Sequence, residues 1–294
     1  MIRLIYRNVT DYRNPLHKER STYSMGTIKR LNHIFRADGK TIITAFDHGV
    51  NSGPMAGIAD LGAALKQVID AGTDAVILNI GMARRHEALL GRTGLIVRAD
   101  FPCTDYARGS HDSILCVAVE EAVKVGADAV LFNGGPDISG EDIGLERCMI
   151  SIISRLRREC EQYGMPLIAE MVPGGFNPPA EYINLDSLKL AARVAAEAGA
   201  DMLKMPYRSG PDGRTYEEVV NGCEGLPIVV LGGAKTNSQE QFFANIDDAL
   251  KCGAKGVAIG RNIWGHAHPD RVISLLNGLI HEGEDLGQAM KHLD

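Results

Sequence analysis

One lysine of the chain lies inside an apolar run, where a charged side chain needs a specific purpose. Lys204 occurs in Met202-Leu203-Lys204-Met205-Pro206-Tyr207, a pattern typical of a buried β-strand. Burial of an ammonium without a partner is costly, and burial near other cations lowers the pKa of a lysine. A neutral amine of this kind attacks carbonyl carbons and forms Schiff bases. The alternative is an ion pair in the protein interior, with Asp47 or Glu170 as the partner.

Two carboxylates are candidates for moving protons at that amine. Asp47 ends the apolar run Thr41–Asp47, and Glu170 lies within the run Pro166–Val172. A Schiff-base cycle transfers protons several times, which is work for general acids and bases. Either carboxylate could instead serve as a helix cap or a structural pair, because Asp before Gly is also common in turns. His48 is a second candidate base, or a residue that only fixes its loop through hydrogen bonds.

Two glycine-rich turns near the end of the chain predict a phosphate site. Gly232-Gly233 and Gly260-Arg261 each follow an apolar run, and Lys235 adds a further cation. Backbone N–H groups at such turns, the start of a short helix and a guanidinium suit a phosphate group. Asn133, which ends another run, is a further candidate for substrate binding. The pair His266-x-His268 is more typical of a surface loop than of a metal site, so we predict neither metal nor cofactor.

A short sequence motif recurs four times along the chain and shows which elements must position these residues. In each copy a helical pattern ends at a glycine that can adopt the left-handed C′ conformation, and an apolar run follows after two residues. The glycines are Gly72, Gly126, Gly199 and Gly253.

Eight apolar runs alternate with helical segments along the chain. Their nearly continuous hydrophobicity predicts parallel strands covered on both faces, and their number favours a closed (β/α)8 TIM barrel over an open doubly wound sheet. In such barrels the site lies at the carboxyl ends of the strands, so Lys204 should point into the barrel with Met202 and Pro206. The expected strands are Thr41–Asp47, Ala75–Ile80, Leu95–Phe101, Ala129–Asn133, Pro166–Val172, Met202–Tyr207, Pro227–Leu231 and Gly256–Ile259; the helical segments include Ile58–Ala71, Ser113–Val125, Leu145–Tyr163, Ser187–Ala198, Ser238–Cys252 and Arg271–His281.

Length and composition agree with one barrel preceded by an extension. The 294 residues, 45% hydrophobic and 23% charged, exclude long disorder and a coiled-coil rod. We expect residues 39–294 to form the barrel, and the basic extension 1–38 to pack on it or on a neighbouring subunit. The acidic remainder argues against a nucleic-acid partner, and the absence of a long apolar run argues against a membrane span. Six cysteines without a CxxC pair indicate neither disulfides nor zinc, and we expect a cytoplasmic protein.

Several of these segments, taken in order, resemble the archaeal-type class I aldolases. The group includes fructose-bisphosphate aldolase, 2-amino-3,7-dideoxy-D-threo-hept-6-ulosonate synthase and the autoinducer-2 phosphate thiolase. The resemblance covers about residues 25–290 and lies in Asp47-His48-Gly49-Val50-Asn51-Ser52-Gly53-Pro54, Gly164–Ala169, Lys204, Leu231–Asn237 and Gly256–Ile263. It implies that Lys204 is the Schiff-base lysine, Asp47 the carboxylate of the first strand, and the two glycine turns the phosphate site. It also implies a homo-oligomer, often a decamer.

One segment departs from the pattern of that group. The aldolase and the synthase carry Tyr-Pro-Arg-Gly after the fifth strand, with the tyrosine as proton donor, whereas this chain has Val172-Pro173-Gly174-Gly175. Valine cannot transfer a proton, so Glu170 becomes the candidate acid, either directly or through water. We therefore expect a metal-independent lyase that cleaves or forms a C–C bond in a phosphorylated ketose. Thiolase-like acyl transfer to coenzyme A, a transaldolase-like transfer, an isomerase and a non-catalytic sugar-phosphate sensor are the alternatives.

Overall fold

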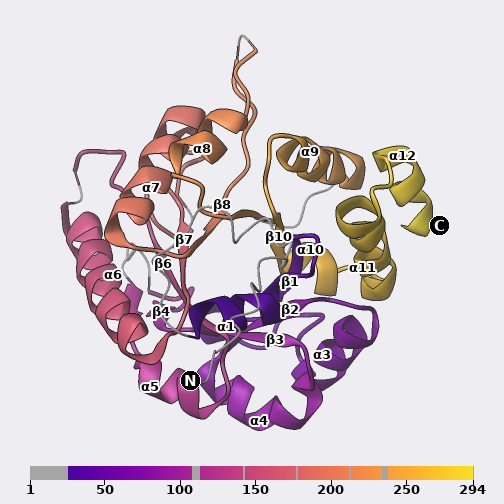
Figure 1. The fold of residues 1–294 in the computed structure, drawn as a ribbon, viewed down its shortest axis with the longest axis horizontal. Helices are drawn as coiled ribbons and strands as arrows, with labels where there is room; N and C mark the ends of the chain where they lie inside the picture. Colours follow the sequence, from indigo (N-terminus) through magenta and orange to yellow (C-terminus); the bar gives the residue numbers. More distant parts are fainter. Residues whose placement is uncertain are drawn as a thin grey trace, which may run out of the picture.

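Eight parallel strands close into a barrel. The computed structural model describes residues 26–107, 113–141, 143–176, 178–211, 213–233 and 238–293. The strands follow one another around the barrel in the order β1-β10-β9-β8-β7-β6-β3-β2, which confirms the predicted closed architecture and excludes the open sheet (Figure 1). Their bounds are β1 Thr41–Ala45, β2 Ala75–Asn79, β3 Gly94–Arg98, β6 Ala129–Gly134, β7 Leu167–Met171, β8 Met202–Met205, β9 Ile228–Leu231 and β10 Gly256–Ile259.

Helices surround the barrel and cover its outer face (Figure 1). Apart from the helix at Ile80–Leu90, which the sequence analysis did not name, the longer ones match the predicted segments to within a few residues, because each carries an apolar face toward the strands. They are α3 Leu61–Asp70, α4 Ile80–Leu90, α6 Ile143–Tyr163, α7 Leu185–Ala198, α9 Gln239–Lys251 and α11 Pro269–Asn277. Shorter helices are α2 Gly49–Ser52, α5 Val119–Lys124, α8 Glu217–Gly222, α10 Arg261–Trp264 and α12 Leu286–Ala289.

The recurring motif has a structural role in addition to ending helices. All four of its glycines adopt positive φ, as the C′ position requires, with φ of 95° at Gly72, 74° at Gly126, 94° at Gly199 and 104° at Gly253. In three copies an aspartate stands two residues after the glycine and accepts a hydrogen bond from the backbone of a neighbouring strand. The donors are the N–H of Ile42 to Asp74 at 2.7 Å, of Leu95 to Asp128 at 3.0 Å, and of Leu167 to Asp201 at 2.9 Å. The motif therefore links adjacent strands near their amino ends.

One predicted strand and one predicted helix are wrong in part. The run Leu95–Phe101 does not form a single strand, since β3 ends at Arg98 and β4 begins at Asp100. Strand β4 (Asp100–Pro102) pairs antiparallel with β5 (Ser113–Leu115), which lies where we expected the start of a helix. The helix begins only at Val119, where Glu121 accepts a hydrogen bond from the Ala118 N–H.

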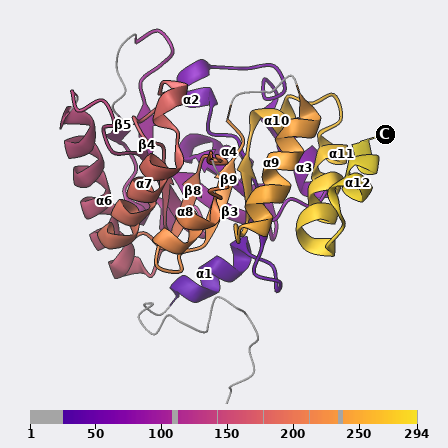
Figure 2. The ribbon, with the colours of Figure 1, turned by 90° about the horizontal axis from the view of Figure 1, so that it is seen from above.

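The barrel interior is apolar in its lower part and is closed at the amino-terminal end by a helix. Helix α1 (Thr27–Ile34) lies across that end, opposite α2, β4 and β5 (Figure 2). Leu31, Ile34 and Phe35 pack from below on the inward side chains of the strands. Those inward residues are Ile43, Ala45, Ala75, Ile77, Ile96, Ala129, Leu131, Ile168, Met202, Val229 and Ala258. The described part of the extension thus packs on the barrel of its own chain.

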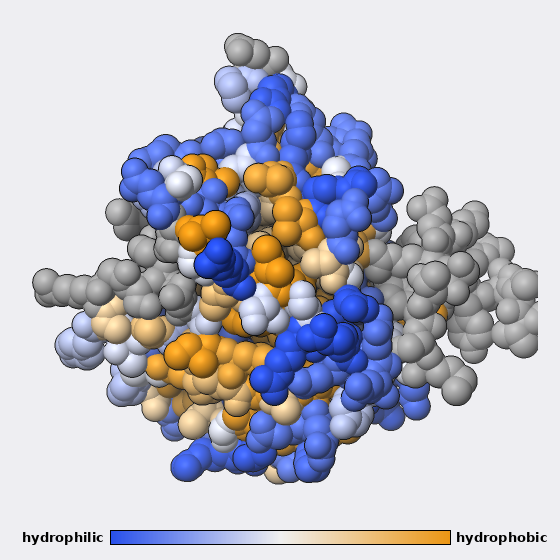
Figure 3. Space-filling model, turned by 90° about the vertical axis from the view of Figure 1, so that its left-hand side faces the viewer, coloured by the Kyte–Doolittle hydropathy of each residue, from blue (hydrophilic) through white to orange (hydrophobic). Residues whose placement is uncertain are grey.

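The outer surface of the side that carries α6 has a marked apolar content (Figure 3). Three isoleucines of α6 and the neighbouring β5 are largely exposed, namely Ile114 at 64%, Ile143 at 65% and Ile150 at 53%.

In the part of the chain that the structure describes, none of the helices is both long and apolar enough to cross a bilayer.

Candidate active site

A cavity of about 930 Å³ opens at the carboxyl ends of the barrel strands. It brings together nearly all of the predicted site residues, although they come from six different strands and the loops behind them. The predicted residues that line it are Asp47, His48, Asn133, Glu170, Lys204, Gly232, Gly233, Gly260 and Arg261. The remaining one, Lys235, lies outside the described residues.

Lys204 points into the barrel, as predicted, and its amine contacts Glu170. The two residues are direct neighbours in the register of β8 and β7, and Nζ lies 2.7 Å from Glu170 Oε1. Both side chains are buried, with 5% of Lys204 and 8% of Glu170 exposed. Among the described carboxylates, Glu170 is the one within ion-pair distance of Nζ. The ion pair that we considered as the alternative to a neutral amine is therefore present.

Asp47 is paired with an arginine that the sequence analysis did not select. Arg98, at the end of β3, places Nη1 2.8 Å from Asp47 Oδ2 and Nη2 3.3 Å from Asp100 Oδ2. The same Nη1 lies 3.9 Å from Glu170 Oε2, so one buried guanidinium faces three carboxylates. Asn79 also holds the loop, because its side-chain amide donates to the Asp47 backbone carbonyl at 2.8 Å.

This arrangement sets the charge states of the inner residues. Burial alone would raise the pKa of Asp47, but the cations of Arg98 and Lys204 outweigh it and hold that pKa well below its ordinary value. Burial raises the pKa of Asp100, against the opposing effect of Arg98. Burial lowers the pKa of His48, and the nearby Lys204 cation lowers it further. Asp47 is therefore a permanent anion at neutral pH, and His48 is neutral.

The two glycine turns pass through places where a side chain would not fit. A Cβ at Gly260 would lie 2.7 Å from both the Ala45 carbonyl oxygen and His48 Cε1. A Cβ at Gly232 would lie 2.8 Å from Ile259 Cγ2, and Gly233 has a φ of 62°. Arg261 begins α10 beside them, and its Nε is buried without a hydrogen-bond partner among the described residues. These features fit the predicted anion site.

The family resemblance implies a tyrosine proton donor at position 172, where this chain has valine. The cavity offers little to replace that tyrosine. Val172 lines the cavity beside Glu170. One tyrosine, Tyr207, also lines the cavity, but its hydroxyl donates a hydrogen bond to Asp248 of α9. Burial and that hydrogen bond both raise the pKa of Tyr207. Glu170 is thus the group in contact with the lysine that can exchange a proton.

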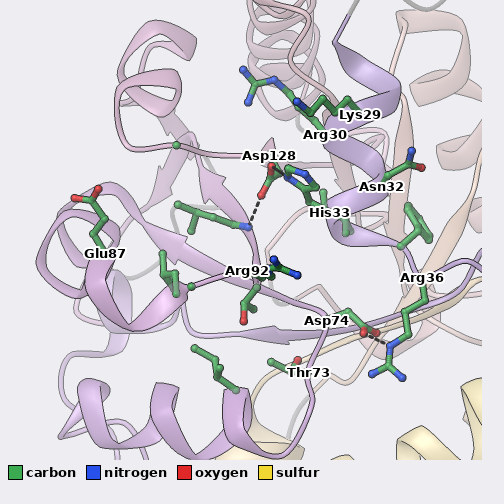
Figure 4. A pocket seen from close by; sticks show the side chains of 18 of the residues that line it. Lys29, Arg30, Asn32, His33, Arg36, Thr73, Asp74, Glu87, Arg92 and Asp128 are labelled. Carbon is green, nitrogen blue, oxygen red and sulfur yellow. Dashed lines mark hydrogen bonds and ion pairs between the residues drawn. The ribbon is translucent and has the colours of Figure 1, made fainter.

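A larger cavity of about 1560 Å³ lies at the opposite end of the barrel, beside α1. It contains none of the predicted site residues. Two pairs of its side chains contact each other: Arg36 contacts Asp74, and His33 Nδ1 lies 2.7 Å from Asp128 Oδ1 (Figure 4). These pairs tie α1 to the strand ends, which is a structural role. Across the described residues, no group of three or more His, Cys, Asp or Glu side chains has a metal-binding arrangement.

Comparison with known proteins agrees with this site. A profile of DeoC/LacD family aldolases matches residues 41–266. The chain belongs to the DeoC/LacD family of aldolases. This aldolase is 32% identical over 270 residues to 2-amino-3,7-dideoxy-D-threo-hept-6-ulosonate synthase 1 of Archaeoglobus fulgidus, covering 92% of this chain and 96% of the relative. It is also 32% identical over 270 residues to the class 1 fructose-bisphosphate aldolase of Thermoproteus tenax, covering 89% and 97%.

Solved structures extend the likeness to the reaction type. An archaeal fructose-1,6-bisphosphate aldolase, with its catalytic lysine covalently bound to the carbinolamine intermediate, superimposes on this aldolase with a TM-score of 0.76. It shares 30% sequence identity, and the match covers 86% of this chain and 99% of that one. A further Schiff-base-forming fructose-1,6-bisphosphate aldolase has a TM-score of 0.76 at 31% identity, covering 87% and 100%. This aldolase is thus a carbon–carbon lyase of the lysine Schiff-base class.

Proposed function

We propose that this aldolase uses Lys204 to form a Schiff base with a phosphorylated ketose and cleaves, or in reverse forms, the adjacent C–C bond. The observation that carries the proposal is the buried amine at the mouth of the barrel, 2.7 Å from a carboxylate that can take its proton. The contact between Lys204 and Glu170 is then a proton-transfer pair and not a permanent link.

Imine formation begins when Glu170 accepts a proton from the Lys204 ammonium. The neutral amine attacks the substrate carbonyl carbon, a C–N bond forms, and the carbonyl oxygen takes up a proton to give a carbinolamine. Protonation of the hydroxyl group by Glu170 allows water to leave, and a cationic iminium remains. Glu170 suits both transfers because it touches the amine and keeps Oε2 buried without a hydrogen-bond partner among the described residues.

Cleavage then uses the iminium as an electron sink. A base removes the proton from the hydroxyl on the carbon that leaves, the C–C bond breaks, and its electron pair neutralises the iminium as an enamine while an aldehyde departs. Asp47, held as an anion by Arg98, stabilises the iminium charge electrostatically. Protonation of the enamine and addition of water then release the ketone and restore the free lysine.

The phosphate of the substrate would bind at the glycine turns that follow β9 and β10. Gly232 and Gly260 line the cavity at this place, and Arg261 supplies a guanidinium. Asn133 and His48 line the cavity between this place and the lysine, where they can orient the hydroxyl groups of the substrate.

A cleavage assay with a panel of ketose phosphates tests the proposal. Lys204→Met should abolish cleavage while leaving the fold intact by circular dichroism, because methionine preserves the packing but not the nucleophile. Lys251→Met, which removes an exposed lysine paired with Asp247, is the matched control and should retain activity. Full activity of Lys204→Met would overturn the proposal.

The absence of a tyrosine at position 172 supports one other reaction as a candidate. Because Val172 stands where the tyrosine-bearing members have their proton donor, acyl transfer from a phosphorylated diketone to coenzyme A is the second candidate. Product analysis with and without coenzyme A separates it from cleavage, since only the transferase consumes the thiol. A transaldolase-like transfer would instead require an added aldehyde acceptor.

A further inference from the structure

The two sides of the active-site cavity differ in charge. On the side formed by β8, β9 and β10, which are consecutive in the barrel, Arg208 and Arg261 flank the Gly232-Gly233 turn. Neither arginine forms an ion pair with a carboxylate of the described residues; Arg208 donates to the Ile183 carbonyl oxygen at 3.1 Å. This side therefore presents two positive charges that no carboxylate of the described residues compensates.

The facing side is polar but not cationic. Asn51, Asp105 and Asn133 line it, and the Asn51 side-chain amide lies 3.5 Å from Asp105 Oδ1. Arg98 is the one lysine or arginine on this side among the described residues that line the cavity, apart from the nucleophile. Its charge is already opposed by Asp47, Asp100 and Glu170.

We infer that the substrate carries a single phosphate, held on the Arg208–Arg261 side, and ends in an uncharged, hydroxyl-bearing group against Asn51, Asp105 and Asn133. The inference deepens the proposed function and rests on it. Amide and carboxylate oxygens can accept hydrogen bonds from sugar hydroxyls, whereas a second phosphate would meet Asp105 with no cation of the described residues to offset it. A ketose monophosphate therefore fits this cavity better than a ketose bisphosphate.

Linear sugar alcohols test this charge asymmetry without any carbonyl chemistry. Calorimetric titration at constant ionic strength would compare mannitol 1-phosphate with mannitol 1,6-bisphosphate and with mannitol. We expect the monophosphate to bind at least about fivefold more tightly than the bisphosphate, a modest penalty for like charges in a partly hydrated site. Tighter binding of the bisphosphate, or no binding of either phosphate, would overturn the inference.

Variants at the two sides sharpen the result. Asp105→Lys should raise the affinity for the bisphosphate relative to the monophosphate by about tenfold, because it replaces a repulsive charge with a phosphate partner. Asp70→Lys, which alters an exposed residue of α3, should leave that ratio unchanged. An Asp105→Lys ratio equal to that of the wild type would contradict the inference.

The outcome stays distinguishable from a failure of the proposed function. Mannitol phosphates have no carbonyl group and cannot react with Lys204, so their relative affinities report only on the charges of the cavity. A monophosphate preference without cleavage activity would leave the charge asymmetry standing and remove the lyase reaction.

Discussion

The proton held between Lys204 and Glu170 is the feature at the residue scale on which the chemistry depends. A glutamine at position 170 can still accept a hydrogen bond from Nζ but cannot take its proton. We therefore expect Glu170→Gln to lower kcat by about 10²- to 10⁴-fold, the usual contribution of a general acid–base group. Glu120→Gln, at an exposed residue paired with Lys124, is the control in the same steady-state assay. Unchanged turnover in Glu170→Gln would remove this residue from the mechanism.

His48 gives a pH dependence whose sign follows from its environment. Burial, aided by the Lys204 and Arg261 cations, lowers its pKa in the folded state, so the unfolded chain binds a proton first. Stability contributed by neutral His48 is full above the unfolded pKa of about 6.5 and falls by up to about 1.4 kcal/mol per pH unit below it, until the folded pKa is reached.

Urea unfolding at pH 7.5 and 5.5 measures this effect. The wild type should lose more stability between the two pH values than His48→Gln, which cannot take up the proton. Equal losses in the two proteins would show that His48 does not titrate differently on folding.

The sequence was sufficient to place Lys204, Asp47 and Glu170 in one candidate site, because each is a charged residue in or directly after an apolar strand. It was not sufficient to identify Arg98, which lies in the equally apolar run Leu95–Phe101. Its partner Asp47 comes from β1, and only the closure of the barrel shows that the two side chains meet. The spacing of Arg98 and Asp100 on one face of the run was the available signal, since two opposite charges two residues apart in an apolar run can pair with each other inside the protein.

The aspartates of the recurring motif, Asp74, Asp128 and Asp201, link one secondary-structure element to the next, because each accepts a hydrogen bond from a neighbouring strand. Asp128 accepts the Leu95 N–H at 3.0 Å and also contacts His33 of α1. We expect Asp128→Ala to lower the free energy of unfolding by about 1–3 kcal/mol, because a buried N–H loses its acceptor. Asp70→Ala, at an exposed ion pair, should change it by less than about 0.5 kcal/mol in the same urea titration. A similar small change in Asp128→Ala would contradict this role.

Most elements could be predicted from hydropathy because each helix and strand buries its own apolar face. The hairpin of β4 and β5 could not, because its two strands are separated by the segment 103–112 and are stabilised by pairing with one another. Local sequence carries no direct record of such pairing, and the apolar content of Ser113–Leu115 therefore looked like the start of the following helix.

At the scale of the whole molecule, the repeat count was enough to predict closure of the barrel, whereas the position of α1 was not predictable. Leu31, Ile34 and Phe35 fill the amino-terminal end of the barrel, which leaves the opposite end as the entrance for a substrate. The charge difference across that entrance likewise appears only when loops from distant parts of the sequence come together.

Assembly is a further prediction at this scale. Exposed isoleucines such as Ile143 and Ile150 on α6 are typical of surfaces that are covered by another molecule, and the family resemblance implies a homo-oligomer. Sedimentation velocity should therefore give a mass that is a multiple of the 31.7 kDa chain. A single species of 31.7 kDa over a wide concentration range would contradict this expectation.

The central claim is that Lys204 forms an imine with a ketose phosphate, and chemical trapping tests it most directly. The protein would be incubated with each of a panel of ketose phosphates, reduced with borohydride, and examined by intact-mass and peptide-mass measurement. We predict one stable adduct per chain with the mass of the reduced substrate imine, located on the peptide that contains Lys204 and absent without substrate. No adduct, or an adduct on a different lysine, would contradict the claim.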